Sequence, residues 1–531
     1  MALKLILPLL LLCHPVLSLT WTPCATQHNT TLPISCATLP VPLDYTTPTS
    51  QNITLQLLKL PAPIQPPKGT IQLNFGGPGS PTHASLVSLG PILQLLSGSA
   101  YDLVGFDPRG TGTTIPFSCT NDKYYAGNIV AEARSSKDSD TAARRLWERG
   151  RVDGFICQYE GSGNGNETAE YLGTAAVARD LISVADALEG DGLLYYWGFS
   201  YGTTLGATVA AMFPDRVGGM VLDGVQNPGD YYYALADFEE WTDTDLVFSH
   251  FFSSCIEAGK EKCALAGLNK TAAELEADTW VFLDSLRDEP IGAGLIVFDL
   301  LMAKSFLAEQ LKSVAGWPGL SALLKPIVYG TKEQKRAVLT ALSQSLAAQE
   351  GSTDLGLLSA HWGIHCGDRT IRTDNFDEIL DAFARLSNTS RLVGDTVAWV
   401  TAHCAQWPWR AKEVYMGDFR VKTRNPMLIA STSRDSHTPL RSALNISAGF
   451  EGSRVLEVNG SGHAIINAPS VCGFRALVAY WINGTLPEGG NLCQTAKAFD
   501  TYTWKNVFEE VGLADGSESP ERRAAYKRSL R

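Results

Sequence analysis

Short apolar runs alternate with amphipathic segments along the first 230 residues and again after residue 423. Runs rich in β-branched and aromatic residues are typical of strands, whereas apolar residues spaced three or four apart are typical of helices. The alternation predicts a mostly parallel central sheet covered by helices, which is an α/β fold. The expected strands are 53–60, 70–75, 101–107, 193–197, 219–223, 426–431 and 454–458, and the clearest expected helices are 175–188 and 203–213.

Between about residues 230 and 423 this alternation stops. The region is rich in Leu, Ala, Glu and Lys and predicts helices, among them 270–287 and 332–350. Because it follows the expected strand 219–223 and precedes the strand 426–431, we interpret residues 230–423 as a helical cap inserted into the sheet domain and folded over its active site.

The first eighteen residues have the composition of a secretory signal peptide. Lys4 supplies a positive charge, and residues 5–12 form an apolar run too short to span a bilayer. Val16-Leu17-Ser18 offers a site for cleavage after Ser18, so we expect a secreted protein without a membrane anchor. The expected parts are the signal peptide 1–18, the core in two pieces 19–229 and 424–495, the cap 230–423 between them, and an extension 496–531 that is polar and partly disordered from about residue 514.

Cysteines and glycosylation sequons agree with export. Of the eleven cysteines, Cys13 falls within the signal peptide, and the ten that remain are an even number, which in an exported chain indicates disulfides. Their spacing suggests five sequential local pairs, namely Cys24–Cys36, Cys119–Cys157, Cys255–Cys263, Cys366–Cys404 and Cys472–Cys493. Eight Asn-x-Ser/Thr sequons predict N-glycosylation, at Asn29, Asn52, Asn166, Asn269, Asn388, Asn445, Asn459 and Asn483. Asn459 is the weakest, because it lies four residues before a candidate active-site histidine.

Composition and charge exclude some partners. The 531 residues are 45% hydrophobic and 18% charged, which is enough to build a large core. The net charge of −12 is spread along the chain, whereas nucleic-acid phosphates require clustered Lys and Arg. We expect a small peptide or ester as the partner, with neither nucleic acid nor membrane, and no metal or other cofactor. The sequence does not indicate an oligomeric state.

The strongest chemical motif is Gly198-Phe199-Ser200-Tyr201-Gly202, which joins the expected strand 193–197 to the expected helix 203–213. A G-x-S-x-G between a strand and a helix is the nucleophile elbow of the α/β-hydrolases, in which a tight turn holds the serine above the sheet. We therefore predict an α/β-hydrolase fold with a helical cap, and Ser200 as the nucleophile.

The acid and the base should follow the serine in that order along the chain. Asp435 comes after the expected strand 426–431, and His463 comes after the strand 454–458. His463 would take the Ser200 proton during attack, while Asp435 would fix the imidazole tautomer. Asp223 stays open as a replacement acid. His437, on the same loop as Asp435, is expected to lie at the surface or to line a pocket.

An oxyanion hole should combine two backbone amides. The first is that of Tyr201, directly after the nucleophile. The second should come from the loop Asn74-Phe75-Gly76-Gly77-Pro78-Gly79, with Gly77 as the first choice and Gly76 as the next. Although such a loop could cradle a phosphate, it lacks the Gly-Lys-Ser/Thr ending of a nucleotide site.

Taken together, these motifs resemble the tripeptidyl aminopeptidase/proline iminopeptidase group of α/β-hydrolases. The resemblance is carried by Asn74-Phe-Gly-Gly-Pro-Gly, Gly105-Phe-Asp-Pro-Arg-Gly, Gly198-Phe-Ser-Tyr-Gly-Thr, Leu222-Asp-Gly-Val, Asp435-Ser-His-Thr-Pro and a stretch from His463 to Cys493 similar to the TAP-like C-terminal region. It implies a secreted serine exopeptidase that releases short peptides or single residues from free N-termini, with Ser200, Asp435 and His463 as triad and Gly77 and Tyr201 at the oxyanion hole.

An aminopeptidase also needs carboxylates for the substrate ammonium group, and Asp368, Glu239 and Glu240 are the candidates, although a surface acid is the simpler interpretation of each. The chain departs from the family at Phe75, where proline is usual, and at 80–83, which puts the substrate in doubt. A carboxylesterase or lactonase with the same triad is the second interpretation, and a non-catalytic binding protein on a hydrolase fold is the third.

Overall fold

The computed structural model describes residues 19–47, 49–119, 135–137, 139–159, 168–188, 190–349, 355–490 and 492–513. The expected signal peptide 1–18, the sequon at Asn166 and the polar tail from residue 514 lie outside these residues.

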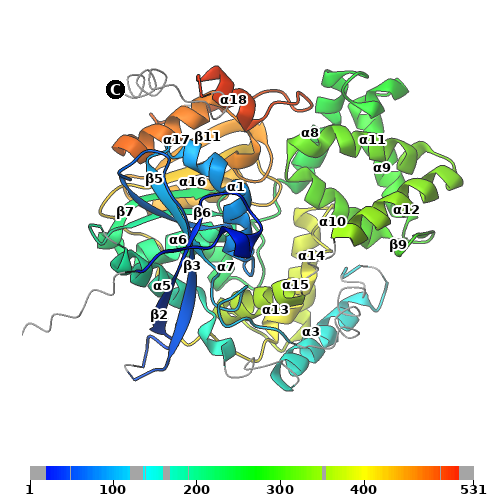
Figure 1. Cartoon of the computed structure of the whole chain (residues 1–531). Helices are drawn as coiled ribbons and strands as arrows, with labels where there is room; N and C mark the ends of the chain where they lie inside the picture. The colour runs from blue at the N-terminus through cyan, green and yellow to red at the C-terminus, as the bar shows by residue number, and fades with distance from the viewer. Residues whose placement is uncertain are drawn as a thin grey trace, which may run out of the picture.

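A ten-stranded sheet forms the centre of the molecule (Figure 1). Its strands run antiparallel at one edge, from β1 to β5, and parallel from β5 to the other edge. In spatial order they are β1 (Thr22–Pro23), β2 (Ser35–Pro42), β3 (Asn52–Leu60), β5 (Tyr101–Phe106), β4 (Gly69–Asn74), β6 (Leu194–Phe199), β7 (Val217–Asp223), β10 (Leu428–Arg434), β11 (Arg454–Ser461) and β12 (Leu492–Gln494). Each expected strand is confirmed with only its ends shifted, while β1, β2 and β12 were not expected.

Helices cover both faces of the sheet, as buried parallel strands require. Strand β6 shows the alternation, because Tyr196 belongs to one core and Trp197 to the other. One face packs against α5 (Thr174–Ala187), α6 (Tyr201–Met212) and α16 (Leu440–Gly449). The opposite face packs against α1 (Thr82–Leu96), α17 (Val471–Asn483) and α18 (Trp504–Glu510), so part of the C-terminal extension is folded onto the core.

A helical region lies between β7 and β10, and its described residues include one short hairpin, β8 (Ile291–Ala293) with β9 (Ile296–Phe298). Its helices are α7 (Pro228–Tyr233), α8 (Thr244–Ala258), α9 (Ala272–Ser285), α10 (Leu300–Leu311), α11 (Trp317–Tyr329), α12 (Lys332–Gln349), α13 (Leu355–His361), α14 (Phe376–Thr389) and α15 (Ala398–Ala405). The expected helices 270–287 and 332–350 are confirmed by α9 and α12. Short 3₁₀ segments are η1 (Ala25–His28), η2 (Ala169–Tyr171), η3 (Pro214–Arg216), η4 (Ala264–Leu268), η5 (Val314–Gly316) and η7 (Ile465–Asn467).

The helical region has two cores of its own. Helices α8 to α12 enclose the first, which contains Phe248 and Trp317, and form the green lobe to the right of the sheet in Figure 1. Helices α14 and α15 form the second together with α3 (Ala142–Tyr159), which contributes Trp147. Although α3 precedes the nucleophile motif in sequence, it therefore packs with the helical region.

Five disulfides link neighbouring cysteines and are the same five local pairs that the spacing suggested: Cys24–Cys36, Cys119–Cys157, Cys255–Cys263, Cys366–Cys404 and Cys472–Cys493. Among the described residues, no helix combines the length and the apolar character needed to cross a membrane.

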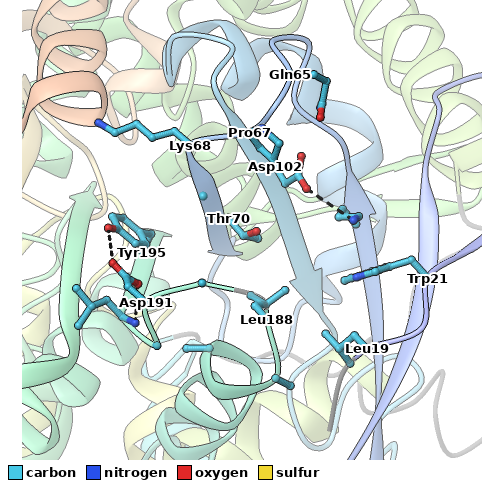
Figure 2. A pocket seen from close by; sticks show the side chains of 17 residues that line it. Leu19, Trp21, Gln65, Pro67, Lys68, Thr70, Asp102, Leu188, Asp191 and Tyr195 are labelled. Carbon is cyan, nitrogen blue, oxygen red and sulfur yellow. Dashed lines mark hydrogen bonds and ion pairs between the residues drawn. The ribbon is translucent and has the colours of Figure 1, made fainter. Parts of the chain in front are cut away.

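Figure 2 shows a cavity of about 560 Å³ at the amino ends of the parallel strands. Gly69 at the start of β4 and Tyr195 near the start of β6 line it, together with Trp21 and Lys68. Since the nucleophile motif follows the carboxyl end of β6, this cavity lies at the opposite end of the sheet from the expected active site.

Candidate active site

Ser200 occupies the turn between β6 and α6, where its backbone is strained. Its φ of 55° and ψ of −126° are rare for a residue other than glycine, and such strain is concentrated at functional sites. The Ser200 N–H donates to the Asp223 carbonyl oxygen at 3.1 Å, which fixes the turn to the neighbouring strand. A side chain at Gly202 would place its Cβ 2.6 Å from the Asn74 carbonyl oxygen, so this turn requires glycine.

Asp435 and His463 face each other across the carboxyl ends of β10 and β11. Both carboxylate oxygens of Asp435 lie 3.1 Å from His463 Nδ1. Asp435 is fully buried and also accepts the Thr438 hydroxyl at 2.7 Å and the Ala464 N–H at 2.9 Å. Burial alone would raise the pKa of Asp435, but the charge of His463 and these hydrogen bonds hold it below its usual range. An ionised carboxylate at Nδ1 leaves His463 Nε2 as the basic nitrogen.

The strand order places these groups beside Ser200, because β6, β7, β10 and β11 are neighbours and their carboxyl ends meet at one edge. Asp223, at the end of β7, accepts the Ile465 N–H at 2.7 Å on one carboxylate oxygen. Its carbonyl accepts the Ser200 N–H, so Asp223 ties the nucleophile turn to the loop of His463. Burial, reinforced by the charge of Asp435, raises the pKa of Asp223 to about 8. A structural role therefore fits Asp223 better than that of the orienting acid.

His437 lies beside His463, in a half-buried position. Its ring centre is 5.5 Å from that of His463 and 5.2 Å from that of Trp241, which comes from the helical region. Burial lowers the pKa of His437 well below its usual range, with the neighbouring Lys312 and His463 acting in the same direction. The neutral ring of His437 therefore packs against His463 and Trp241.

The glycine loop after β4 lies directly on the nucleophile turn. A Cβ on Gly76 would be 2.9 Å from Ser200 Cβ and 3.0 Å from the Tyr201 nitrogen. The Gly76 N–H donates to Asn74 Oδ1 at 3.0 Å, so that amide already has a partner. This favours Gly77 over Gly76 as the second oxyanion donor beside Tyr201.

Phe75, where the related family has proline, takes part in an aromatic stack. Its ring stacks on Phe199 with centres 5.5 Å apart, and Phe199 stacks on Trp197 at 5.4 Å. The large residue at this position therefore packs the glycine loop against the end of β6.

Asp368 does not lie open to a substrate. It is fully buried, and it accepts the Thr174 hydroxyl at 2.5 Å, the Thr174 N–H at 3.0 Å and the Tyr231 hydroxyl at 3.0 Å. Burial raises the pKa of Asp368 to about 7. The expectation of a surface acid is wrong for this residue, and its contacts argue against its role as an ammonium ligand, which we do not propose further.

Glu239 is also committed to protein partners. Its carboxylate accepts the Ser442 hydroxyl at 2.7 Å and the side-chain amides of Asn227 and Asn445, each at 3.2 Å.

Unlike Glu239, Glu240 has too little positive charge around its carboxylate to offset the cost of burying it. Its carboxylate accepts the Gln226 side-chain amide at 3.2 Å. Gln226 in turn accepts the hydroxyl of Thr204 at 2.8 Å, in the first turn of α6. Burial and the nearby charge of Asp237 raise the pKa of Glu240 well above its usual range. Of the three acids, Glu240 is the one best placed to gain from an incoming cation.

Two neighbouring histidines of the helical region lie near the glycine loop: His361, which the sequence analysis did not single out, contacts it, and His365, for which local packing was expected, packs behind it against His361. His361 Nδ1 is 3.3 Å from the Pro78 carbonyl oxygen, and His365 Nε2 is 3.3 Å from a carboxylate oxygen of Asp237. His361 directly precedes a π-helix, Trp362–Cys366, and His365 lies within it; this form of helix is frequent at functional sites. Their spacing of four residues on one helical segment was a signal in the sequence.

The helical region also contacts the loop of His463. The His463 N–H donates to the Lys312 carbonyl oxygen at 2.7 Å, and Ser313 pairs with Gly462. In the described part of the chain, the one group spaced to hold a metal is Cys24, His28 and Cys36, but both of its sulfurs are joined in a disulfide.

Comparison with known proteins matches two parts of the chain to family models, residues 73–301 to the alpha/beta hydrolase fold and residues 390–493 to TAP-like proteins. Among curated relatives, the tripeptidyl aminopeptidase of Streptomyces coelicolor is 28% identical over 482 residues, which cover 87% of this chain and 84% of the relative. The serine protease Hip1 of Mycobacterium tuberculosis is 26% identical, covering 89% and 90%. Carboxylesterase B of Mycobacterium tuberculosis is 26% identical, covering 86% of each. A solved acetylester hydrolase from Corynebacterium glutamicum aligns at a TM-score of 0.36 and 14% identity over 83% of this chain and 91% of that one, too distant for an argument about function.

Proposed function

From its membership of the α/β-hydrolases with a TAP-like C-terminal region, we propose that this serine hydrolase is an exported aminopeptidase that releases short peptides or single residues from free N-termini. The expected signal peptide, the even number of cysteines and the sequons support export. The names of the relatives, two of which are peptidases, support a peptide substrate.

The proposed reaction passes through an acyl-enzyme. His463 Nε2 takes the proton of the Ser200 hydroxyl as its oxygen attacks the scissile carbonyl carbon. The resulting oxyanion accepts hydrogen bonds from the amides of Tyr201 and Gly77. As the C–N bond breaks, His463 gives its proton to the leaving amine, and a water activated by the same nitrogen then hydrolyses the ester. The contact of Asp435 with His463 Nδ1 is the observation that carries this assignment of roles.

We further propose that Glu240 binds the substrate ammonium group. A carboxyl with a raised pKa lacks sufficient positive charge around it, so an ammonium beside it is attracted and stabilises the ionised form. Through Gln226 and Thr204 the carboxylate is held to the first turn of α6, close to the nucleophile. A carboxylate held in this position would fix the distance between the substrate ammonium group and the scissile bond.

Matched peptide anilides with free and acetylated amino termini test the proposal. We expect kcat/KM to favour the free tripeptide anilide by about 10-fold or more, because an unpaired buried carboxylate costs about 1–3 kcal/mol. Glu240→Gln should remove most of this preference. Glu239→Gln is the matched control, since its carboxylate is already occupied, and it should retain the preference. Equal rates on both substrates in the wild-type enzyme would contradict the aminopeptidase assignment.

A carboxylesterase or lactonase with the same catalytic groups is the second candidate, and the similarity to carboxylesterase B favours it specifically. Activity confined to acyl esters and lactones, with none on anilides of either kind, would establish it in place of the peptidase. The interpretation as a non-catalytic binding protein gains no support from the relatives, which are hydrolases by name.

A further inference from the structure

One short segment of the helical region contacts the glycine loop of the expected oxyanion hole directly and reaches Tyr201 through Thr174. It runs from His361, the last residue of α13, through the π-helix Trp362–Cys366 to Asp368, and Figure 1 shows α13 next to the label of α15, at the bottom of the view. We propose that residues 361–368 position the two oxyanion amides, with His361 acting on the glycine loop and Asp368 acting on Tyr201. This inference rests on the proposed role of Ser200 and its oxyanion hole.

His361 holds the glycine loop from outside. A Cβ on Gly79 would lie 2.8 Å from the Leu357 carbonyl oxygen and 2.9 Å from the His361 nitrogen, so the loop and the end of α13 are in backbone contact. Burial lowers the pKa of His361 to about 3, which keeps the ring neutral with one N–H to donate. Donation from Nδ1 to the Pro78 carbonyl oxygen at 3.3 Å then fixes the loop immediately after Gly77.

Asp368 reaches the other amide through two hydrogen bonds in series. Thr174 donates its hydroxyl to Asp368 at 2.5 Å, and therefore accepts the Tyr201 hydroxyl, 2.6 Å away. Tyr231 also donates its hydroxyl to the same Asp368 oxygen, at 3.0 Å. The ring of Tyr201 is buried, so fixing its hydroxyl restricts the residue whose backbone N–H should bind the oxyanion.

The segment is itself firmly anchored. Cys366 in the π-helix is joined to Cys404 of α15 by a disulfide. Directly after Asp368, the buried Arg369 donates to both carboxylate oxygens of Asp237, at 2.8 and 2.7 Å. An anchored element that contacts the loop of Gly77 and, through Thr174, the side chain of Tyr201 can set the separation of the two amides, and oxyanion stabilisation depends on donors placed within tenths of an ångström.

His361→Phe tests the first contact, because phenylalanine fills the space of the ring but cannot donate. Loss of a whole oxyanion donor lowers kcat by about 10²–10³-fold, so a displaced donor should lower it by about 10- to 100-fold with KM nearly unchanged. His361→Asn restores an N–H near the position of Nδ1 and should recover much of kcat. Tyr201→Phe, which removes the hydroxyl that contacts Thr174, tests the second contact. It should also lower kcat with KM nearly unchanged.

The decisive readout is the rate ratio of an activated ester to its thionoester, in which sulfur replaces the carbonyl oxygen. Sulfur is a poor acceptor, so a well-set oxyanion hole gives a high ratio and a displaced one gives a lower ratio. We expect the ratio to fall in His361→Phe and Tyr201→Phe. His403→Phe is the control, because His403 is another buried histidine near a backbone carbonyl, with Nδ1 2.7 Å from the Trp399 oxygen, but its Nε2 lies 2.7 Å from Asp153 and not against the glycine loop. Its ratio is compared once the variant is shown to be folded, since phenylalanine removes the hydrogen bond to Asp153, and it should keep the wild-type value.

These outcomes separate the inference from the proposed function. Serine peptidases and esterases both cleave activated esters, so the test does not depend on the natural substrate. If Ser200→Ala retains turnover, the proposed function fails. If Ser200→Ala is inactive but folded His361→Phe and Tyr201→Phe keep the wild-type ratio, the positioning role fails, even where kcat has dropped. If His361→Phe does not fold, the ester-to-thionoester ratio of Tyr201→Phe alone decides whether the positioning role holds.

Discussion

At the scale of single residues, two buried aspartates at the ends of neighbouring strands have pKa values that are shifted in opposite directions. Burial raises the pKa of both, but His463 brings that of Asp435 below its usual range, while Asp223 stays at about 8. Asp435→Asn should keep the fold and lower kcat by about 10³–10⁴-fold, because it favours the wrong imidazole tautomer. Asp223→Asn should retain most activity, since its amide oxygen can still accept the Ile465 N–H.

The pH dependence of the free energy of unfolding should also distinguish Asp223 from Asp435. Because the pKa of Asp223 is raised in the folded state, its contribution is fully present below pH 4 and declines as pH rises towards 8. The Asn variant lacks this titration, so its stability relative to wild type should rise by roughly 5 kcal/mol between pH 4 and pH 8 in urea unfolding, at about 1.4 kcal/mol per pH unit. For Asp435, with its lowered pKa, the contribution is present at neutral pH and lost in acid. An inactive, fully folded Asp223→Asn beside an active Asp435→Asn would reverse the assignment.

At the scale of elements, the site depends on how closely α6 approaches β4. Gly202→Ala would bring a methyl group 2.6 Å from the Asn74 carbonyl oxygen and 2.8 Å from Asn74 Oδ1, which holds the Gly76 amide. We expect a loss of about 1–3 kcal/mol in stability and a lower kcat, measured by denaturant unfolding and steady-state kinetics. Gly292→Ala in the β8–β9 hairpin is the control, because a Cβ there meets nothing within 4 Å. Equal behaviour of the two variants would show that α6 can move away from β4 without cost.

At the scale of the whole molecule, the folded surface decides which sequons can carry glycans. Asn459 is half-buried, and its side-chain amide donates to Gln494 at 3.0 Å. In a eukaryotic secretory host we expect export with residues 1–18 removed, and no glycan at Asn459. Glycans are expected at the exposed sequons Asn29, Asn52, Asn269, Asn388, Asn445 and Asn483. Peptide mapping before and after enzymatic deglycosylation measures both, and retention in the cell with the N-terminal segment intact would contradict export.

Local pattern was enough for much of the fold. The central strands and the turn at Ser200 were predicted because side-chain periodicity and a tight glycine turn are properties of a few consecutive residues. Strand β2 was missed because Pro40 and Pro42 oppose a strand assignment. Beyond its two-residue pairing with β1, however, β2 forms an edge, where missing N–H donors cost little.

The sequence by itself determined the fold class, the nucleophile motif and the chain order of the candidate acid and base. Only the tertiary structure decided which aspartate faces His463, that Asp368 is buried behind Tyr201 and not open to a substrate, and that α3 packs with the helical region. It alone brought His361 onto the glycine loop, 283 residues away along the chain. The reason is physical: periodicity and turn chemistry act between near neighbours, whereas these contacts arise when distant segments pack, and local patterns do not encode which segments will meet.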